Sequence, residues 1–164
     1  MCQTLFDCCS LEQRLAILRA IQGDIISISS KERGNRTMQH IIRLATSPEE
    51  ENILKEAFQG RVVRLSIQLH SCPVICVLLY TLKNRDFLIQ EIVGYVRELA
   101  CDKWGSCVIG RCINDPRILN ELLREAIVLM QDKHGNGVLQ IMIDNWQQEC
   151  SLSIINCIKG KVVQ

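Results

Sequence analysis

The 164-residue sequence is poor in aromatic residues, glycine and proline. Aromatic residues make up 4% of the chain, and it has only nine glycines and three prolines. Valine and isoleucine are plentiful, but they rarely alternate with polar residues, so the pattern of half-buried strands is missing. Because 48% of the residues are hydrophobic, the chain can bury a core and is not disordered. These features favour a helical protein.

Charge of one sign and long apolar runs are also lacking. The formal net charge of +1 argues against a protein that holds duplex DNA by charge. It leaves open a protein that binds single strands by stacking and by hydrogen bonds to base edges. The longest strongly apolar run, Pro73 to Tyr80, is far too short to span a bilayer, so we expect no membrane partner. The N-terminus has no signal-peptide pattern, and we expect a cytoplasmic protein.

The ten cysteines follow irregular spacings and include no C-x-x-C pair. Without export their thiols should stay reduced, and we expect most of them to be small core side chains. A zinc site formed by Cys101, Cys107, Cys112 and His134 is a minor alternative, because this spacing matches no standard zinc motif. We therefore predict neither a metal nor a cofactor.

Motifs of common enzymes are missing as well. The sequence has no G-x-S-x-G, no glycine-rich phosphate loop, no H-E-x-x-H and no spaced carboxylate pair with a base. Spacing alone does not exclude a Cys–His nucleophile, although ten cysteines make some chance proximity unavoidable. We predict that the protein is not an enzyme and has no catalytic residues.

Internal repetition is the main feature that is present. Four similar segments follow one another, and their aligned polar positions lie 36, 35 and 30 residues apart. The segments are Lys31–Ile42, Gln68–Ile75, Asp102–Ile113 and Asp132–Ile143, aligned on Asn35, Ser71, Ser106 and Asn136. A period of this length is typical of a solenoid, in which stacked helical units bury a continuous core.

Signals around these segments indicate three helices in each unit. A glycine followed by apolar residues precedes three of the segments, and Ser47-Pro48 and Asp115-Pro116 have the pattern of a helix cap followed by proline. Each unit is thus expected to contain a short helix, a helix opened by the Gly-Asn/Ser phrase, and a longer capped helix. Gly160 begins the first phrase again near the end, which suggests either a fragment or a shortened member of a longer repeat family.

We predict one all-α domain over residues 1–164. It comprises an N-terminal helix or cap at 1–20 and units at 21–56, 57–92, 93–124 and 125–164, the last including the start of a fifth.

The most informative cluster of polar residues is Asn35, Arg36 and Gln39. Positions i and i+4 share a helix face, so the two amides can form a fork of donors and acceptors about one base wide. The flat guanidinium of Arg36 can stack on the face of a base. A single helix would then present a base-edge reader together with a stacking plane.

On these residues the sequence resembles a known family. Gly34–Gln39 and Asp132–Gln140 are similar to the RNA-reading helix of Pumilio (Puf) repeats, and the resemblance extends from about Ser10 to Gln164. It implies a right-handed α-solenoid of three-helix repeats, shaped as a crescent, that binds single-stranded RNA on its concave side. The implied targets are U-containing sites in messenger 3′ untranslated regions, where binding regulates translation and mRNA stability. Protein effectors on the convex face are also implied.

The resemblance assigns an edge reader, a stacker and a second edge reader to each unit. In chain order these are Asn35, Arg36 and Gln39; Ser71, Cys72 and Ile75; Ser106, Cys107 and Gly110; and Asn136, Gly137 and Gln140. The first unit has the full trio of a uracil reader, whereas Gly137 has no side chain to stack. Gly110 lacks the second edge group, and Ile75 offers van der Waals contact without hydrogen bonds.

Two other functions remain open from the sequence. One is a helical-repeat scaffold that binds protein, as armadillo and HEAT proteins do. The low net charge and the two units that lack a polar second edge reader favour this function. The other is a degenerate family member with weak RNA binding. Because stacking contributes ~1–3 kcal/mol per base and few units are complete, we predict an affinity no tighter than about micromolar, roughly −8 kcal/mol.

Overall fold

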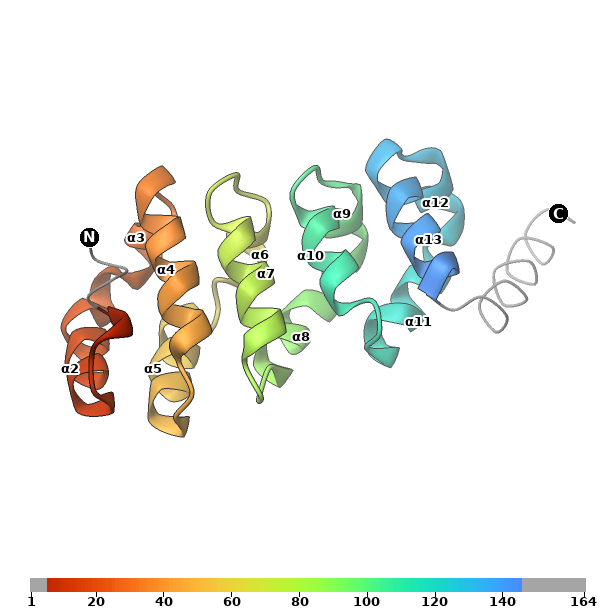
Figure 1. Ribbon diagram of the computed structural model, residues 1–164. Helices are drawn as coiled ribbons and strands as arrows, with labels where there is room; N and C mark the ends of the chain where they lie inside the picture. The colour runs from red at the N-terminus through yellow and green to blue at the C-terminus, as the bar shows by residue number, and fades with distance from the viewer. Residues whose placement is uncertain (1–5, 146–164) are drawn as a thin grey trace, which may run out of the picture. The chain divides into compact units, whose positions relative to one another are not determined.

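The computed structural model describes residues 6–145, and all the regular structure in that range is helical (Figure 1). The chain divides into two compact parts, one up to Leu88 and one from Ile89 onward. The expected all-α class is therefore confirmed. The predicted start of a fifth unit, at Gly160, lies outside the described residues.

The helices recur in sets of three: a short helix, a middle helix that carries the predicted RNA-binding positions, and a third helix; the described residues include the first two helices of the fourth set. In chain order the elements are α2 (Leu11–Ile21), η1 (Gln22–Asp24), α3 (Ile25–Ser29), α4 (Glu32–Leu44), α5 (Pro48–Phe58), α6 (Val62–Ser66), α7 (Cys72–Thr81), α8 (Asp86–Val93), α9 (Val96–Cys101), α10 (Gly105–Cys112), α11 (Pro116–Arg124), α12 (Ala126–Gln131) and α13 (Lys133–Asn145). The middle helices are α4, α7, α10 and α13. The third helix is not generally the longer one, since α5 has 11 residues and α4 has 13.

The expected caps open α5 and α11, which are the third helices of the first and third units. The Ser47 hydroxyl accepts a hydrogen bond from the Glu50 N–H at 3.1 Å, and the Glu50 carboxylate accepts one from the Ser47 N–H at 3.0 Å, which completes a capping box. Asp115 caps α11 by accepting from the Arg117 N–H at 3.0 Å. These side chains satisfy N–H groups that the helix itself leaves unpaired.

A buried ion pair joins α2 to α5 in the first part. The Glu50 side chain has no exposed surface, and its Oε1 lies 2.9 Å from Nε of Arg14. Burial alone raises the pKa of the Glu50 carboxyl, but hydrogen bonds from Arg14 and from the N–H groups of Ser47 and Thr46 outweigh it and hold the pKa below its ordinary value. The carboxylate is thus charged, paired and saturated with donors.

Each part has its own apolar core between its helices. In the first part α4 packs against α3 and beside α7, and in the second part α10 and α13 pack against each other and against α9 (Figure 1). Fully buried side chains include Leu18, Ile25, Met38, Ile42, Leu54, Phe58, Ile75 and Leu78 in the first part and Leu99, Val108, Ile109, Leu122, Leu129 and Met142 in the second. The middle helices are therefore held by packing on their inner sides.

The cysteines depart from the expectation that most lie in the core. Among those in the described residues only Cys72 and Cys112 are buried, while Cys8 and Cys107 are exposed. The other three, Cys9, Cys76 and Cys101, are half-buried. Within residues 6–145 no three metal-binding side chains gather, and none of the helices there is long and apolar enough to cross a bilayer.

Candidate functional site

The four middle helices begin with the same backbone hydrogen bonds, and these bonds fix how the units align. One N–H at the start of each helix donates to the carbonyl four residues earlier, at distances of 2.8 to 3.0 Å. The donors are Asn35, Cys72, Ser106 and Asn136, and the acceptors are Lys31, Gln68, Asp102 and Asp132. The equivalent positions therefore lie 37, 34 and 30 residues apart.

A close approach between helices supports the same alignment. A Cβ atom on Gly105 would lie 2.6 Å from the carbonyl oxygen of Leu99, and one on Gly135 would lie 2.9 Å from that of Leu129. Each glycine follows its contact residue by six positions. In the second unit the residue equivalent to Leu99 and Leu129 is Leu65, and the sixth residue after it is Ser71.

Ser71 is fully buried at this point. Its hydroxyl lies 3.1 Å from that of Ser30 and donates to Gln68 Oε1 at 3.1 Å. Ser71 therefore takes the place of the glycines and not that of Asn35.

The sequence alignment of the second unit was thus wrong by one residue. The predicted set of Ser71, Cys72 and Ile75 becomes Cys72, Pro73 and Cys76. Ile75 is fully buried, like Met38 in the first unit, and offers no surface for the predicted van der Waals contact with a base. The error arose because the unit has no glycine at the close approach, so a polar serine was matched to a polar asparagine.

In α4 the two predicted edge readers lie one turn apart on the same face, as expected. Gln39 donates through Nε2 to Oδ1 of Asn35 at 3.1 Å. Asn35 is only 7% exposed, and its Nδ2 donates to the carbonyls of Lys31 and Glu32 at 3.1 and 2.8 Å. The structure thus makes Asn35 a support for Gln39, in contrast to the open amide that the sequence suggested.

Three accessible side chains of α4 lie around this amide pair: Arg36, Gln39 and Arg43. Arg36 is exposed and Gln39 is half-buried. Arg43 Nη2 donates to Oε1 of Gln39 at 3.3 Å, so the Gln39 amide is held from both sides. A base edge approaching Gln39 would meet an oriented donor and acceptor, with a guanidinium one turn to either side.

The corresponding face of α7 is apolar. The residues equivalent to Arg36, Gln39, His40 and Arg43 are Pro73, Cys76, Val77 and Tyr80. Pro73, Cys76 and Val77 are half-buried, and Tyr80 is 85% exposed. This face offers shape and aromatic surface but no amide for a base edge.

In α10 the predicted trio is accessible but has few polar groups. Cys107 is exposed, and the Ser106 hydroxyl donates to the Lys103 carbonyl at 3.2 Å. At Gly110 an added Cβ would lie 3.7 Å from Cδ1 of Ile141, so the side chain of the next unit stands where a second edge reader would reach.

In α13 both predicted edge readers, Asn136 and Gln140, are exposed. The structure records no side-chain hydrogen bond for either amide within residues 6–145. Gly137 adjoins a hollow of about 240 Å³ between α10 and α13. The hollow is lined by Ser106, Cys107, Lys133, His134, Gly137, Val138 and Ile141.

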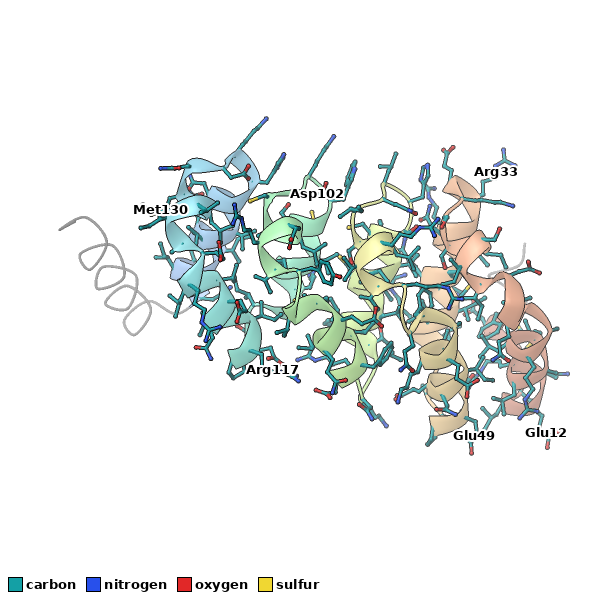
Figure 2. All side chains as sticks on the ribbon, turned by 180° about the vertical axis from the view of Figure 1, so that it is seen from behind. Glu12, Arg33, Glu49, Asp102, Arg117 and Met130 are labelled. Atoms are coloured by element: carbon teal, nitrogen blue, oxygen red, sulfur yellow. The ribbon has the colours of Figure 1, made fainter. Side chains whose placement is uncertain are left out.

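Equivalent aspartate side chains cap the first turns of α10 and α13. Asp102 Oδ1 accepts from the N–H groups of Trp104 and Gly105, both at 2.8 Å, and Asp132 is bonded in the same way to His134 and Gly135. Figure 2 shows Asp102 at the turn before α10. The hydrogen bond from Gly135 is the main reason that the pKa of Asp132 lies below its ordinary value.

Cys101 lies beside this cap and is not an activated nucleophile. Burial, and then the nearby Asp132 carboxylate, raise the pKa of its thiol. A thiol with a raised pKa carries little of the reactive thiolate.

Sequence reasoning missed Pro73, Cys76, Lys133 and His134 as members of this surface. The spacing of apolar residues could have identified Pro73 and Cys76. The buried positions of α4 and its C-cap are Asn35, Met38, Ile41, Ile42 and Ala45, and the same spacing in α7 and its C-cap gives Cys72, Ile75, Leu78, Leu79 and Leu82. The sequence carried no signal of the hollow that Lys133 and His134 line.

The fold and surface together define a class: an α-solenoid of three-helix units whose middle helices carry the variable polar positions. The sequence model of the "Pumilio-family RNA binding repeat" matches residues 1–22, 24–56, 95–115 and 126–158. The chain therefore belongs to the Pumilio family. The matched segments leave out residues 57–94, the stretch that contains α7, and they include the N-terminal residues that we had expected to be only a helix or cap.

Individual relatives and a solved structure that resemble this chain are consistent with this family membership. Pumilio homolog 12 of Arabidopsis thaliana is 27% identical over 99% of this chain and 29% of its own length. Pumilio homolog 9 of the same plant is 28% identical over 87% of this chain and 27% of its own length. The Puf4 RNA-binding domain, solved bound to the HO endonuclease RNA 3′ UTR recognition sequence, has a TM-score of 0.85 and 27% identity, covering 88% of this chain and 47% of that domain. The chain thus spans less than a third of these curated relatives and about half of the solved domain.

Proposed function

We propose that this chain binds single-stranded RNA with sequence preference. Its targets are U-containing sites in messenger 3′ untranslated regions, and binding regulates translation and mRNA stability. The observation that carries the proposal is the arrangement on α4, where exposed Arg36 lies beside a Gln39 amide held between Asn35 and Arg43. The exposed amide pair on α13, in another repeat that the family model matches, supports it.

Gln39 is the main base-edge reader of the first unit. Its amide presents a donor and an acceptor whose direction is fixed by two neighbours, so less side-chain entropy is lost when a base binds. Asn35 acts as a positioning residue, because its side-chain N–H groups donate to the backbone carbonyls of Lys31 and Glu32 at the start of α4. Arg36 supplies the plane on which the base stacks.

The other units contribute unequally. Asn136 and Gln140 can read a base edge, while Ser106 and Cys107 provide one hydroxyl and one small side chain. The corrected trio of the second unit has no amide at all. With one complete reader and one amide pair, we expect an affinity no tighter than about micromolar, roughly −8 kcal/mol.

Regulation by an RNA-binding repeat needs no catalytic step, and we propose that the protein acts by binding alone. It acts on mature messages in the cytoplasm, with protein effectors on the face opposite the RNA.

A protein-binding scaffold is the second candidate, and one observation favours it. The outward face of α7 is apolar, and the nearby Ile67 and Leu69 are 46% and 52% exposed. Exposed apolar side chains that lie close together are typical of protein-binding surfaces.

Fluorescence anisotropy with labelled eight-nucleotide RNAs tests the proposal. We expect binding at about micromolar concentration to a U-containing strand and weaker binding to an A-rich strand of equal length. Equal binding to both strands, or nanomolar affinity, would contradict the residue assignment. The absence of RNA binding together with capture of a protein on α7 would support the scaffold.

A further inference from the structure

The hollow between α10 and α13 exists because Gly137 stands where the first unit has Arg36. A Cβ added to Gly137 would meet no atom within 4 Å, so the space beside it is open. Ser106 and Cys107, two of the predicted RNA-binding residues, form the opposite wall. The hollow is therefore continuous with the proposed RNA surface.

His134 lines this hollow from one turn before Gly137. Residues i and i+3 share a helix face, so the imidazole lies on the side from which a stacking residue at 137 would project. Its position is defined, because the Asp132 cap bonds the backbone N–H groups of both His134 and Gly135 at 2.8 Å. The side chain is half-buried and lines the hollow.

The position of His134 carries a planar side chain in every unit once the register is corrected. The equivalents, two residues before Asn35, Cys72, Ser106 and Asn136, are Arg33, His70, Trp104 and His134. Figure 2 shows Arg33 pointing away from the helices near the start of α4. In the third unit the ammonium of Lys103 lies 4.6 Å from the centre of the Trp104 ring, whereas in the fourth unit Lys133 and His134 both border open space.

We propose that His134 and Lys133 bind one nucleotide of the RNA: the base enters the hollow and stacks on the imidazole, and the Lys133 ammonium contacts its phosphate. This assignment rests on the proposed RNA-binding function and adds a stacking group that the fourth unit otherwise lacks. The volume of about 240 Å³ is below the roughly 300–1,000 Å³ of pockets for drug-sized ligands, and it suits a single base. The mixed lining suits a base as well, with Val138 and Ile141 against its ring and Ser106 near its edge.

The test uses the full chain and a series of U-containing eight-nucleotide RNAs, each with one abasic site at a different position. We expect His134→Ala to weaken binding of the intact RNA about tenfold and His134→Phe, which keeps a planar ring, to stay within about twofold. With one particular abasic RNA the alanine and wild-type proteins should bind equally, because the stacked base is already gone. Gln131→Ala, an exposed residue outside the hollow, is the matched control and should change nothing.

Three results would overturn the assignment. These are wild-type affinity for His134→Ala, equal weakening by alanine and phenylalanine, or an alanine effect that persists with every abasic RNA. Thermal melting of each variant shows whether a loss reflects unfolding, and the phenylalanine variant separates ring stacking from general damage. If Gln39→Ala weakens binding while His134→Ala does not, only this inference fails. If the wild-type chain binds no RNA, the proposed function fails with it.

Discussion

The middle helices α4 and α7 pack in the same way but present different outward surfaces. Both bury residues at the same spacing, and both begin with the same backbone hydrogen bond. Outward, α4 carries arginines and an oriented glutamine, whereas α7 carries proline, cysteine, valine and an exposed tyrosine. The inward positions therefore specify the repeat, and the outward positions can change their chemistry without changing the fold.

The ion pair that joins α2 to α5 can be removed by replacing Glu50. We expect Glu50→Ala to lower the free energy of unfolding by about 3–5 kcal/mol, because it leaves the partly buried Arg14 charge without its partner. Urea denaturation measures the change. Glu49→Ala removes an exposed neighbour in the same turn and should have little effect; equal losses from the two variants would contradict the role of the buried pair.

The same carboxylate predicts a dependence of stability on pH. The pKa of Glu50 in the folded chain is lowered from its ordinary value of 4.5. Its contribution to stability is thus present above about that value and is lost as the pH falls through the lower, folded-state pKa. Denaturation measured from neutral to acidic pH should show this loss in the wild-type chain. Glu50→Gln should flatten it, and an unchanged acid profile for that variant would assign the loss to other groups.

The close contact on which the corrected register rests can be tested by exchanging glycine and serine at positions 34 and 71. Gly34→Ser should cost about 1–3 kcal/mol, because its side chain would press on the backbone of Ile28. Ser71→Gly should cost less, about 1 kcal/mol, because it creates no clash and removes only the hydroxyl that is hydrogen-bonded to Ser30 and Gln68. Thermal melting of both variants gives the comparison. Tolerance of serine at 34 would mean that the contact with Ile28 does not restrict this position to glycine.

Sequence reasoning found the repeat, the helical class and the caps because these depend on local spacing. The Ser47–Glu50 box and the adjacency of Asn35 and Gln39 follow directly from helix geometry. It failed where a contact between helices decided the outcome. Nothing local shows that Ser71 replaces a glycine at a close approach, that the Asn35 amide is used by its own backbone, or that Gly137 opens a hollow beside His134.

The outward surface of α7 can be converted toward that of α4 by Cys76→Gln. The new amide would take the position of Gln39, and one added hydrogen bond contributes about 0.5–1.5 kcal/mol. RNA affinity measured by anisotropy should therefore rise by a few-fold. Cys76→Met, of similar length but without an amide, is the control and should not tighten binding. Equal affinities for the two variants would mean that α7 does not contact base edges.

The central claim is that the polar outward face of α4, and not helical packing in general, binds RNA. Its most direct test is the anisotropy of a U-containing eight-nucleotide RNA with the Arg36→Ala/Gln39→Ala protein beside the Pro73→Ala/Cys76→Ala protein, both with melting curves. We predict that the α4 pair loses tenfold or more in affinity, in line with a stacking contribution of ~1–3 kcal/mol, while the α7 pair stays within about twofold. Equal affinities for the two proteins and the wild-type chain, with unchanged melting, would contradict the account.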